Sequence, residues 1–205
     1  KNKARLILLN KADLADEKSN EAWVSYFQEK GYCVRKINSR SGAGLKAINT
    51  AVLEACHEKI ERDKRRGIKN RPVRAMVVGI PNVGKSTFIN AYAGKACAKT
   101  GNKPGVTKGK QWIRLNKSLE LLDTPGILWP KFEDQNVGMR LAMIGSIKDE
   151  ILNTDELALS LIRFLIENYP GRLEERYGCE EKAAEGLAVY EEIAKRRGCV
   201  KRGQE

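Results

Sequence analysis

The strongest constraint on the fold of this chain is one short stretch, Gly79-Ile80-Pro81-Asn82-Val83-Gly84-Lys85-Ser86, which has the pattern GxxxxGK[ST]. It lies between an apolar run at residues 74–79 and an amphipathic pattern at residues 85–93. A glycine-rich loop between a strand and a helix directs backbone N–H groups at a phosphate, and the helix N-terminus adds a favourable dipole. A chance glycine-rich turn would not need both flanking elements. The stretch therefore predicts a phosphate-binding loop, with these residues around the phosphates: Asn82, Val83, Gly84, Lys85, Ser86 and Thr87.

The rest of the first half alternates between strand and helix patterns, which is typical of an α/β fold. Apolar runs predict five strands, the last two paired as an antiparallel hairpin, at residues 5–9, 33–37, 74–79, 111–114 and 119–122. Helical patterns occupy residues 20–29, 45–66 and 85–93.

After residue 130 the strand signals stop and the chain becomes helical and charge-laced. Apolar residues recur at helical spacing over 157–166 and stop before Pro170, and a second helix is expected over 180–197. We therefore expect a sheet domain at residues 1–131 and a small all-helical domain at residues 132–205.

The nucleotide base is indicated by Asn10-Lys11-Ala12-Asp13, which directly follows the first predicted strand and has the pattern NKxD. An aspartate there can accept hydrogen bonds from the N1–H and the amino group of guanine, which adenine does not offer. The same four residues also suit a surface turn. Together with the phosphate loop they predict selectivity for GTP and GDP.

Three further segments suit the same site. Asp123-Thr124-Pro125-Gly126 follows the last predicted strand, so that Asp123 can hold Mg²⁺ through water and the Gly126 N–H can meet the γ-phosphate. Thr107, in Pro104-Gly105-Val106-Thr107, is a candidate Mg²⁺ ligand beside Ser86, although that segment also suits a type II turn. Asn38 and Ser39 follow the second strand and can place a serine or a backbone amide at the guanine O6.

The order of these motifs differs from that of Ras-like GTPases, in which the phosphate loop comes first and NKxD follows DxxG. Here NKxD and the serine loop precede the phosphate loop, and no second NKxD follows Gly126. We conclude that the chain is a circularly permuted P-loop GTPase sheet domain followed by the helical domain.

That order, with the stretches IPNVGKSTFIN and LLDTPGILWPKFED, closely resembles the bacterial ribosome biogenesis GTPase A family over essentially the whole chain. The resemblance implies a GTPase that joins assembly intermediates of the large (50S) ribosomal subunit, contacts rRNA and hydrolyses GTP as it leaves. It also implies a segment before the NKxD strand. A six-stranded Ras-type sheet would need one more strand upstream of Lys1, so we expect an N-terminal strand and helix to be missing.

The catalytic group is not evident. Ras-like proteins place a glutamine just after DxxG to orient the attacking water, and this chain has Ile127, which cannot hydrogen-bond water. The resemblance implies a histidine in the N-terminal segment as the substitute. The one histidine present, His57, lies in a predicted helix with no motif around it. Asn82 matches a position that helps to bind K⁺ in several GTPases lacking the glutamine, and its alternative role is to shape the loop.

Composition fits a nucleic-acid partner. The chain carries 38 Lys+Arg against 26 Asp+Glu, a net charge of +12, and residues 59–74 are densely basic. Such a segment suits phosphate contacts with rRNA, although charge runs are more often solvated surface. No apolar stretch approaches the roughly 20 residues that cross a membrane. The five cysteines are never spaced as CxxC, which argues against a disulfide framework and favours a cytoplasmic protein, which we expect to be monomeric.

Two other functions remain open at this stage. One is a nucleotide-gated RNA-binding module that binds GTP without intrinsic hydrolysis. The other is a permuted GTPase of the small-subunit type, but neither the oligonucleotide-binding barrel nor the Cys/His zinc motif of those proteins is visible.

Overall fold

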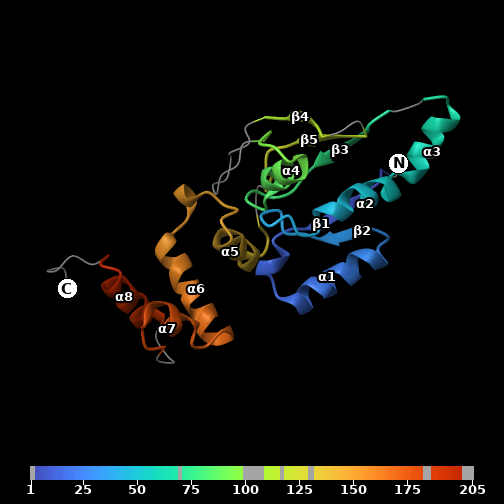
Figure 1. The fold of residues 1–205 in the computed structure, drawn as a ribbon. Helices are drawn as coiled ribbons and strands as arrows, with labels where there is room; N and C mark the ends of the chain where they lie inside the picture. Colours follow the sequence, from blue (N-terminus) through green and yellow to red (C-terminus); the bar gives the residue numbers. More distant parts are fainter. Residues whose placement is uncertain are drawn as a thin grey trace. The chain divides into compact units, whose positions relative to one another are not determined.

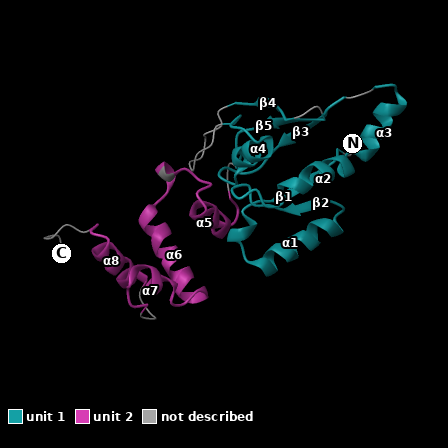
Figure 2. Cartoon of the chain, in the orientation of Figure 1, with its two compact units in different colours: residues 1–130 teal, residues 131–205 magenta. Residues whose placement is uncertain are grey.

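The computed structural model describes residues 3–68, 71–98, 109–115, 118–128, 132–181 and 186–199. The chain divides into two compact units, Lys1–Pro130 and Lys131–Glu205 (Figures 1 and 2). The division falls one residue before the expected domain boundary. Within the described residues, no helix is long and apolar enough to cross a membrane.

The first unit contains the five predicted strands, within one or two residues of their expected ends. β1 (Leu6–Leu9) and β2 (Cys33–Lys36) pair in parallel. β3 (Val73–Val77) pairs in parallel with β5 (Leu119–Asp123), and β4 (Gln111–Arg114) pairs with β5 as the predicted antiparallel hairpin. The strands form two hydrogen-bonded sheets, β1-β2 and β3-β5-β4, where the sequence suggested one.

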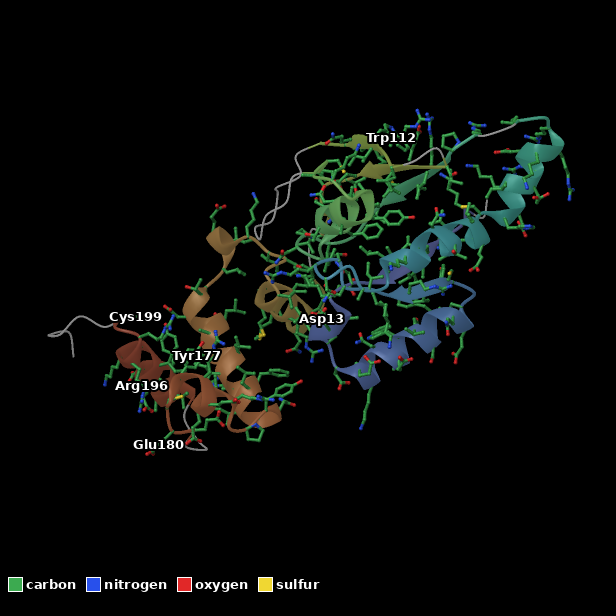
Figure 3. The ribbon with its side chains drawn as sticks, viewed as in Figure 1. Asp13, Trp112, Tyr177, Glu180, Arg196 and Cys199 are labelled. Atoms are coloured by element: carbon green, nitrogen blue, oxygen red, sulfur yellow. The ribbon has the colours of Figure 1, made fainter. Side chains whose placement is uncertain are left out.

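Alternation along β4 separates the two faces of the three-stranded sheet. Ile113 is buried, whereas Trp112 is half-exposed (Figure 3). The Arg74 guanidinium lies over the Trp112 ring, 5.3 Å from the ring centroid. Arg74 is in turn bound to Glu120 on β5, at 2.9 Å. Of these β4 side chains, only Ile113 reaches the core.

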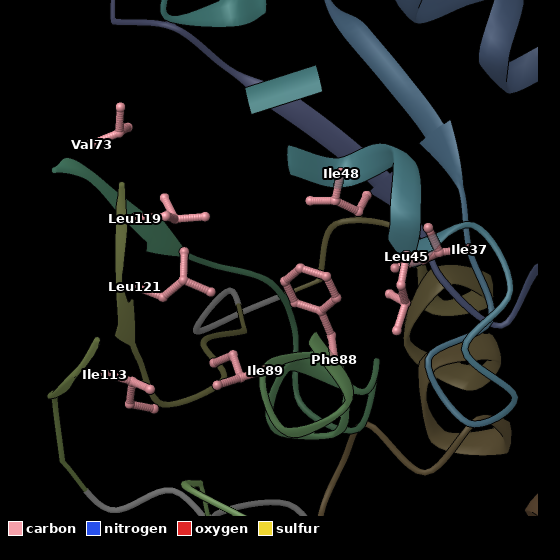
Figure 4. Packing of buried hydrophobic residues seen from close by; sticks show 9 residues of the cluster. All are labelled: Ile37, Leu45, Ile48, Val73, Phe88, Ile89, Ile113, Leu119 and Leu121. Atoms are coloured by element: carbon pink, nitrogen blue, oxygen red, sulfur yellow. The ribbon is translucent and has the colours of Figure 1, made fainter. Parts of the chain in front are cut away.

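One apolar cluster joins the two sheets (Figure 4). α4 (Lys85–Ala93) contributes Phe88 and Ile89, and the segment after β2 contributes Ile37 and Ile48. The strands add the remaining buried members, Val73, Ile113, Leu119 and Leu121, with Leu45 beside Ile37. Because α4 packs here, the loop that precedes it is held at the end of β3.

The helix expected over residues 45–66 is interrupted. It consists of a short 3-10 turn at Leu45–Ala47, α2 (Ile48–Ala55) and α3 (His57–Arg65), with a break at Cys56, where φ is −102° and ψ is 6°. α2 buries Ile48 and Ala51, but α3 buries no residue. After the break, Ile60 still packs partly buried against the core, while most other side chains of α3 are charged.

The helix expected over residues 20–29 begins earlier, and α1 spans Glu17–Glu29. Asp16 caps it, because its Oδ1 accepts from the Ser19 N–H at 2.8 Å. A 3-10 turn at Ala12–Leu14 connects β1 to this cap.

The second unit contains α5 (Gln135–Met143), a 3-10 turn at Asp149–Ile151, α6 (Thr154–Asn168), α7 (Arg172–Tyr177) and α8 (Gly186–Arg196). Its core is formed by Ile162, Leu173, Cys179 and Val189. The prediction that the last helix starts at residue 180 was wrong. The Glu181 carboxylate instead accepts from the backbone of α7 and the turn before it, including the Leu173 N–H at 2.7 Å.

Candidate nucleotide site

The predicted phosphate loop connects β3 to α4. Gly84 precedes the helix at φ 91°, and Asn82 has φ 59°, which non-glycine residues seldom adopt. The Lys85 Nζ donates to the carbonyls of Gly79 and Ile80 at 3.0 and 2.8 Å. Burial lowers the pKa of Lys85, and the nearby Asp123 partly offsets this effect. The loop thus curls around a cation, as a phosphate site requires.

Asn10 connects the three segments that the sequence predicted to meet. Its Nδ2 donates to the Val83 carbonyl of the phosphate loop at 2.8 Å. Its Oδ1 accepts from both the N–H and the hydroxyl of Ser39, at 3.1 and 2.9 Å. Lys11 adds a bond from its Nζ to the Asn82 carbonyl at 2.8 Å. The guanine motif, the serine loop and the phosphate loop therefore form one hydrogen-bonded site.

The serine loop, which carries Asn38 and Ser39, was expected to place either the Ser39 hydroxyl or a backbone amide at the guanine O6, and the structure does not favour the first. Ser39 is buried and its hydroxyl is bonded to Asn10, so it supports the site and does not face a base. The Asn38 Oδ1 accepts from the N–H groups of Arg40 and Ser41 and shapes the turn. A cavity of about 380 Å³ borders this turn, with Ala12, Asp13 and Asn38 in its lining. Asp13 itself is exposed.

Asp123 ends β5 beside the start of α4. Its carboxylate is buried, the Ser86 hydroxyl lies 3.4 Å from Oδ2, and Oδ1 has no hydrogen-bond partner among the described residues. Burial raises the pKa of Asp123, while bonds from Thr124 and Ser86 lower it. A buried carboxylate oxygen without a partner, next to a hydroxyl, is an oxygen donor set that suits Mg²⁺.

Gly126 brings the DxxG segment against the phosphate loop. A Cβ on Gly126 would lie 2.7 Å from the Pro81 Cα and N, closer than any side chain can approach. Ile127, the next residue, is 74% exposed and offers no hydrogen-bonding group. Ile127 therefore provides no group that could orient a water molecule.

Three residues considered in the sequence analysis remain, which are Thr87, Thr107 and His57. Thr87 lies in the first turn of α4, directly after Ser86. Thr107 lies outside the described residues. His57 begins α3 and is the only histidine in the sequence.

One supporting residue was not predicted. Asn20, on α1, is buried and its Nδ2 donates to the Ala12 carbonyl at 3.0 Å. A polar residue on the helix face that also carries Val24 and Phe27 was the signal that could have identified it.

Similarity to known proteins identifies the family of this chain. The family described as "50S ribosome-binding GTPase" matches residues 74–188. "Ribosome biogenesis GTPase A" of Bacillus licheniformis is 53% identical over 205 residues, covering all of this chain and 72% of its own length. The Thermotoga maritima protein of that name is 32% identical over 201 residues, covering 98% of this chain and 66% of its own length.

A solved structure extends the likeness to the fold. The structure titled "Crystal structure of GNP-bound YlqF from T. maritima" matches 97% of this chain and 69% of its own chain, with 29% identity and a TM-score of 0.57. The protein is therefore a GTPase that binds GTP and GDP, and its sheet domain is circularly permuted. The chain belongs to the ribosome biogenesis GTPase A family.

Proposed function

We propose that this GTPase is a cytoplasmic assembly factor for the large ribosomal subunit, which it binds through rRNA in a nucleotide-dependent way. The observation that carries the nucleotide part is the position of Asn10, which bonds to both Val83 and Ser39. The names of the relatives support the ribosomal part, and the five free cysteines suit a reducing compartment.

Guanine selectivity is assigned to Asp13. Asp13 lies two residues after Lys11, whose Nζ donates to the Asn82 carbonyl of the phosphate loop. The base and the phosphates would therefore be recognised by segments that are hydrogen-bonded to each other. An adenine base would leave the carboxylate without its two donors. In the loop at residues 39–41, the Ser39 hydroxyl and N–H donate to Asn10, and the N–H groups of Arg40 and Ser41 donate to Asn38, so a donor for the guanine O6 from this loop would have to exchange one of these bonds.

Magnesium is assigned to the Ser86 hydroxyl and the Asp123 carboxylate, with Thr107 as a further ligand. When bound, Mg²⁺ neutralises charge that develops between the β- and γ-phosphates. Lys85, whose Nζ donates to the Gly79 and Ile80 carbonyls of the loop and whose pKa is lowered by burial, would add a second positive charge there. The Gly126 N–H is the donor for the γ-phosphate.

Hydrolysis by this chain alone is expected to be slow. Ile127 cannot orient the attacking water, and His57 on α3 belongs to no part of the site described above. The catalytic group is therefore supplied from outside these residues, by the segment that the family resemblance implies or by the ribosomal particle. K⁺ beside Asn82 would add positive charge at the phosphates.

RNA contact is assigned first to α3 and the segment after it. α3 buries no residue, and basic side chains occupy its last turn, among them Arg62, Lys64 and Arg65. These three side chains are exposed, whereas Ile60 on the same helix packs against the core, so the cations can contact phosphates without disturbing the fold. The helical unit at residues 132–205 is the second proposed contact.

The test is GTP turnover in KCl and in NaCl, with and without purified large-subunit particles. Turnover that rises with particles, and further in KCl, supports the assembly function and the K⁺ assignment. Particle binding is measured in parallel with GDP and with a non-hydrolysable GTP analogue. Equal affinity in the two states would contradict nucleotide-dependent binding.

A further inference from the structure

We infer that Asn20 is a positioning residue for guanine recognition, because its side-chain amide fixes the peptide that carries Asp13. The inference rests on the guanine site proposed above and adds a residue on α1 to it.

Asn20 occupies a place where an apolar side chain would be expected. It is the one buried residue of α1, at 7% exposure, and α1 packs against β2. A buried amide is unfavourable unless it is hydrogen-bonded. Asn20 compensates for its burial by donating to the Ala12 carbonyl at 3.0 Å, a bond that an apolar residue could not make.

The bond acts on the peptide that leads directly into Asp13, since the Ala12 carbonyl belongs to that peptide plane. The Ala12 N–H is held as well, by the Ile37 carbonyl at 3.3 Å. Both polar backbone groups of Ala12 are thus fixed. The residue before it, Lys11, is in the left-handed region at φ 57°. A non-glycine residue keeps that conformation only when its surroundings hold it.

A second acceptor determines which way the amide faces. The Glu17 Oε2 lies 3.4 Å from the Asn20 Nδ2, and the other oxygen of Glu17 is paired with the Lys36 Nζ at 2.6 Å. With a carbonyl and a carboxylate on the same side, only the NH₂ end of the amide can face them. The hydrogen bond to Lys36 holds the pKa of Glu17 below its usual value, so this carboxylate stays an acceptor.

This geometry predicts a loss of selectivity more than a loss of binding. Asp13 can accept two hydrogen bonds from guanine, but only one from hypoxanthine, which lacks the 2-amino group. If the peptide before Asp13 is released, the bond from the 2-amino group of guanine to the Asp13 carboxylate is lost first, while the contacts of the phosphate loop remain. The affinity for GDP then falls more than the affinity for IDP.

The experiment measures the Kd values of GDP and IDP for the wild type, Asn20→Ala and Asn20→Asp, with folding checked by circular dichroism. We expect Asn20→Ala to lower the GDP/IDP preference by about three- to tenfold, the effect of one lost hydrogen bond. Asn20→Asp should lower it further, because a carboxylate would face the Ala12 carbonyl and Glu17.

Asn168→Ala is the matched control. The Asn168 Nδ2 also donates to a backbone carbonyl, that of Phe164 at 2.9 Å, but within α6 of the other unit. Its preference for GDP should equal that of the wild type. If Asn20→Ala does not fold, the same ratio is measured for Glu17→Ala, an exposed position, where a smaller decrease is expected.

The outcomes separate the inference from the proposed function. A folded Asn20→Ala or, in its place, Glu17→Ala with a wild-type GDP/IDP ratio overturns the inference, even when the melting temperature has fallen. A wild type that does not prefer GDP over IDP contradicts the assignment of guanine to Asp13 itself.

Discussion

Gly126 packs directly on Pro81, so the DxxG segment touches the phosphate loop without any intervening side chain. The distance from a Cβ built on Gly126 to the Pro81 Cα is 2.7 Å, which only glycine tolerates. Backbone atoms of Pro81 therefore border Gly126, whose N–H we proposed as the donor to the γ-phosphate.

Gly126→Ala is expected to weaken binding of a GTP analogue by tenfold or more while leaving GDP affinity within about threefold. The added methyl would push the DxxG backbone away from Pro81, and the Gly126 N–H would lose its place at the γ-phosphate. GDP has no group there. Equal losses for both nucleotides, measured by titration with fluorescent analogues, would contradict this role.

Asn10→Ala is expected to destabilise the first unit by about 1–3 kcal/mol, because it removes the bonds to Val83 and Ser39 and leaves the buried Ser39 hydroxyl without its acceptor. The measurement is the midpoint of urea unfolding. GDP affinity should fall together with stability, since the three loops are no longer joined. Asn168→Ala, which loses a bond in the other unit, is the control for the effect on GDP.

The sequence was sufficient for the strands and the motifs but not for the contacts between them. Apolar runs bounded by motif residues located β1 to β5, because a buried strand must be apolar and a site residue must follow its end. The bond between Asn10 and Val83 joins residues 73 positions apart. The motif order implied this proximity, but the identity of the partner atoms required coordinates.

The errors have a common cause, which is that the ends of helices depend on distant contacts. No glycine or proline marks the break at Cys56, and both Cys56 and Ile60 beyond it still pack against the core. Residues 180–181 have helical character in the sequence, yet Glu181 is used to cap α7. The bond from the Ser39 hydroxyl to Asn10 could not be predicted either, since a hydroxyl cannot be assigned to ligand or protein without its neighbours.

Asp123→Asn is expected to raise the urea midpoint of the protein without Mg²⁺ at neutral pH. The carboxylate is buried and one of its oxygens has no hydrogen-bond partner among the described residues, so its charge is unfavourable to folding, as the raised pKa indicates. The same change should abolish the gain in GDP affinity on adding Mg²⁺. A wild-type response to Mg²⁺ in the variant would show that the ion is held elsewhere.

Neutralising the basic side chains of α3 is expected to weaken RNA binding without affecting the fold. The variant changes Arg62, Lys64 and Arg65 to alanine, and its unfolding midpoint should stay close to that of the wild type because α3 buries no residue. Each lost phosphate contact should lower the slope of log affinity against log salt by about one. The measurement is binding to large-subunit rRNA over a salt series, with Lys18→Ala on α1 combined with Lys30→Ala at its C-terminal cap as the control. An unchanged slope would remove α3 from the RNA interface and leave the helical unit as the proposed contact.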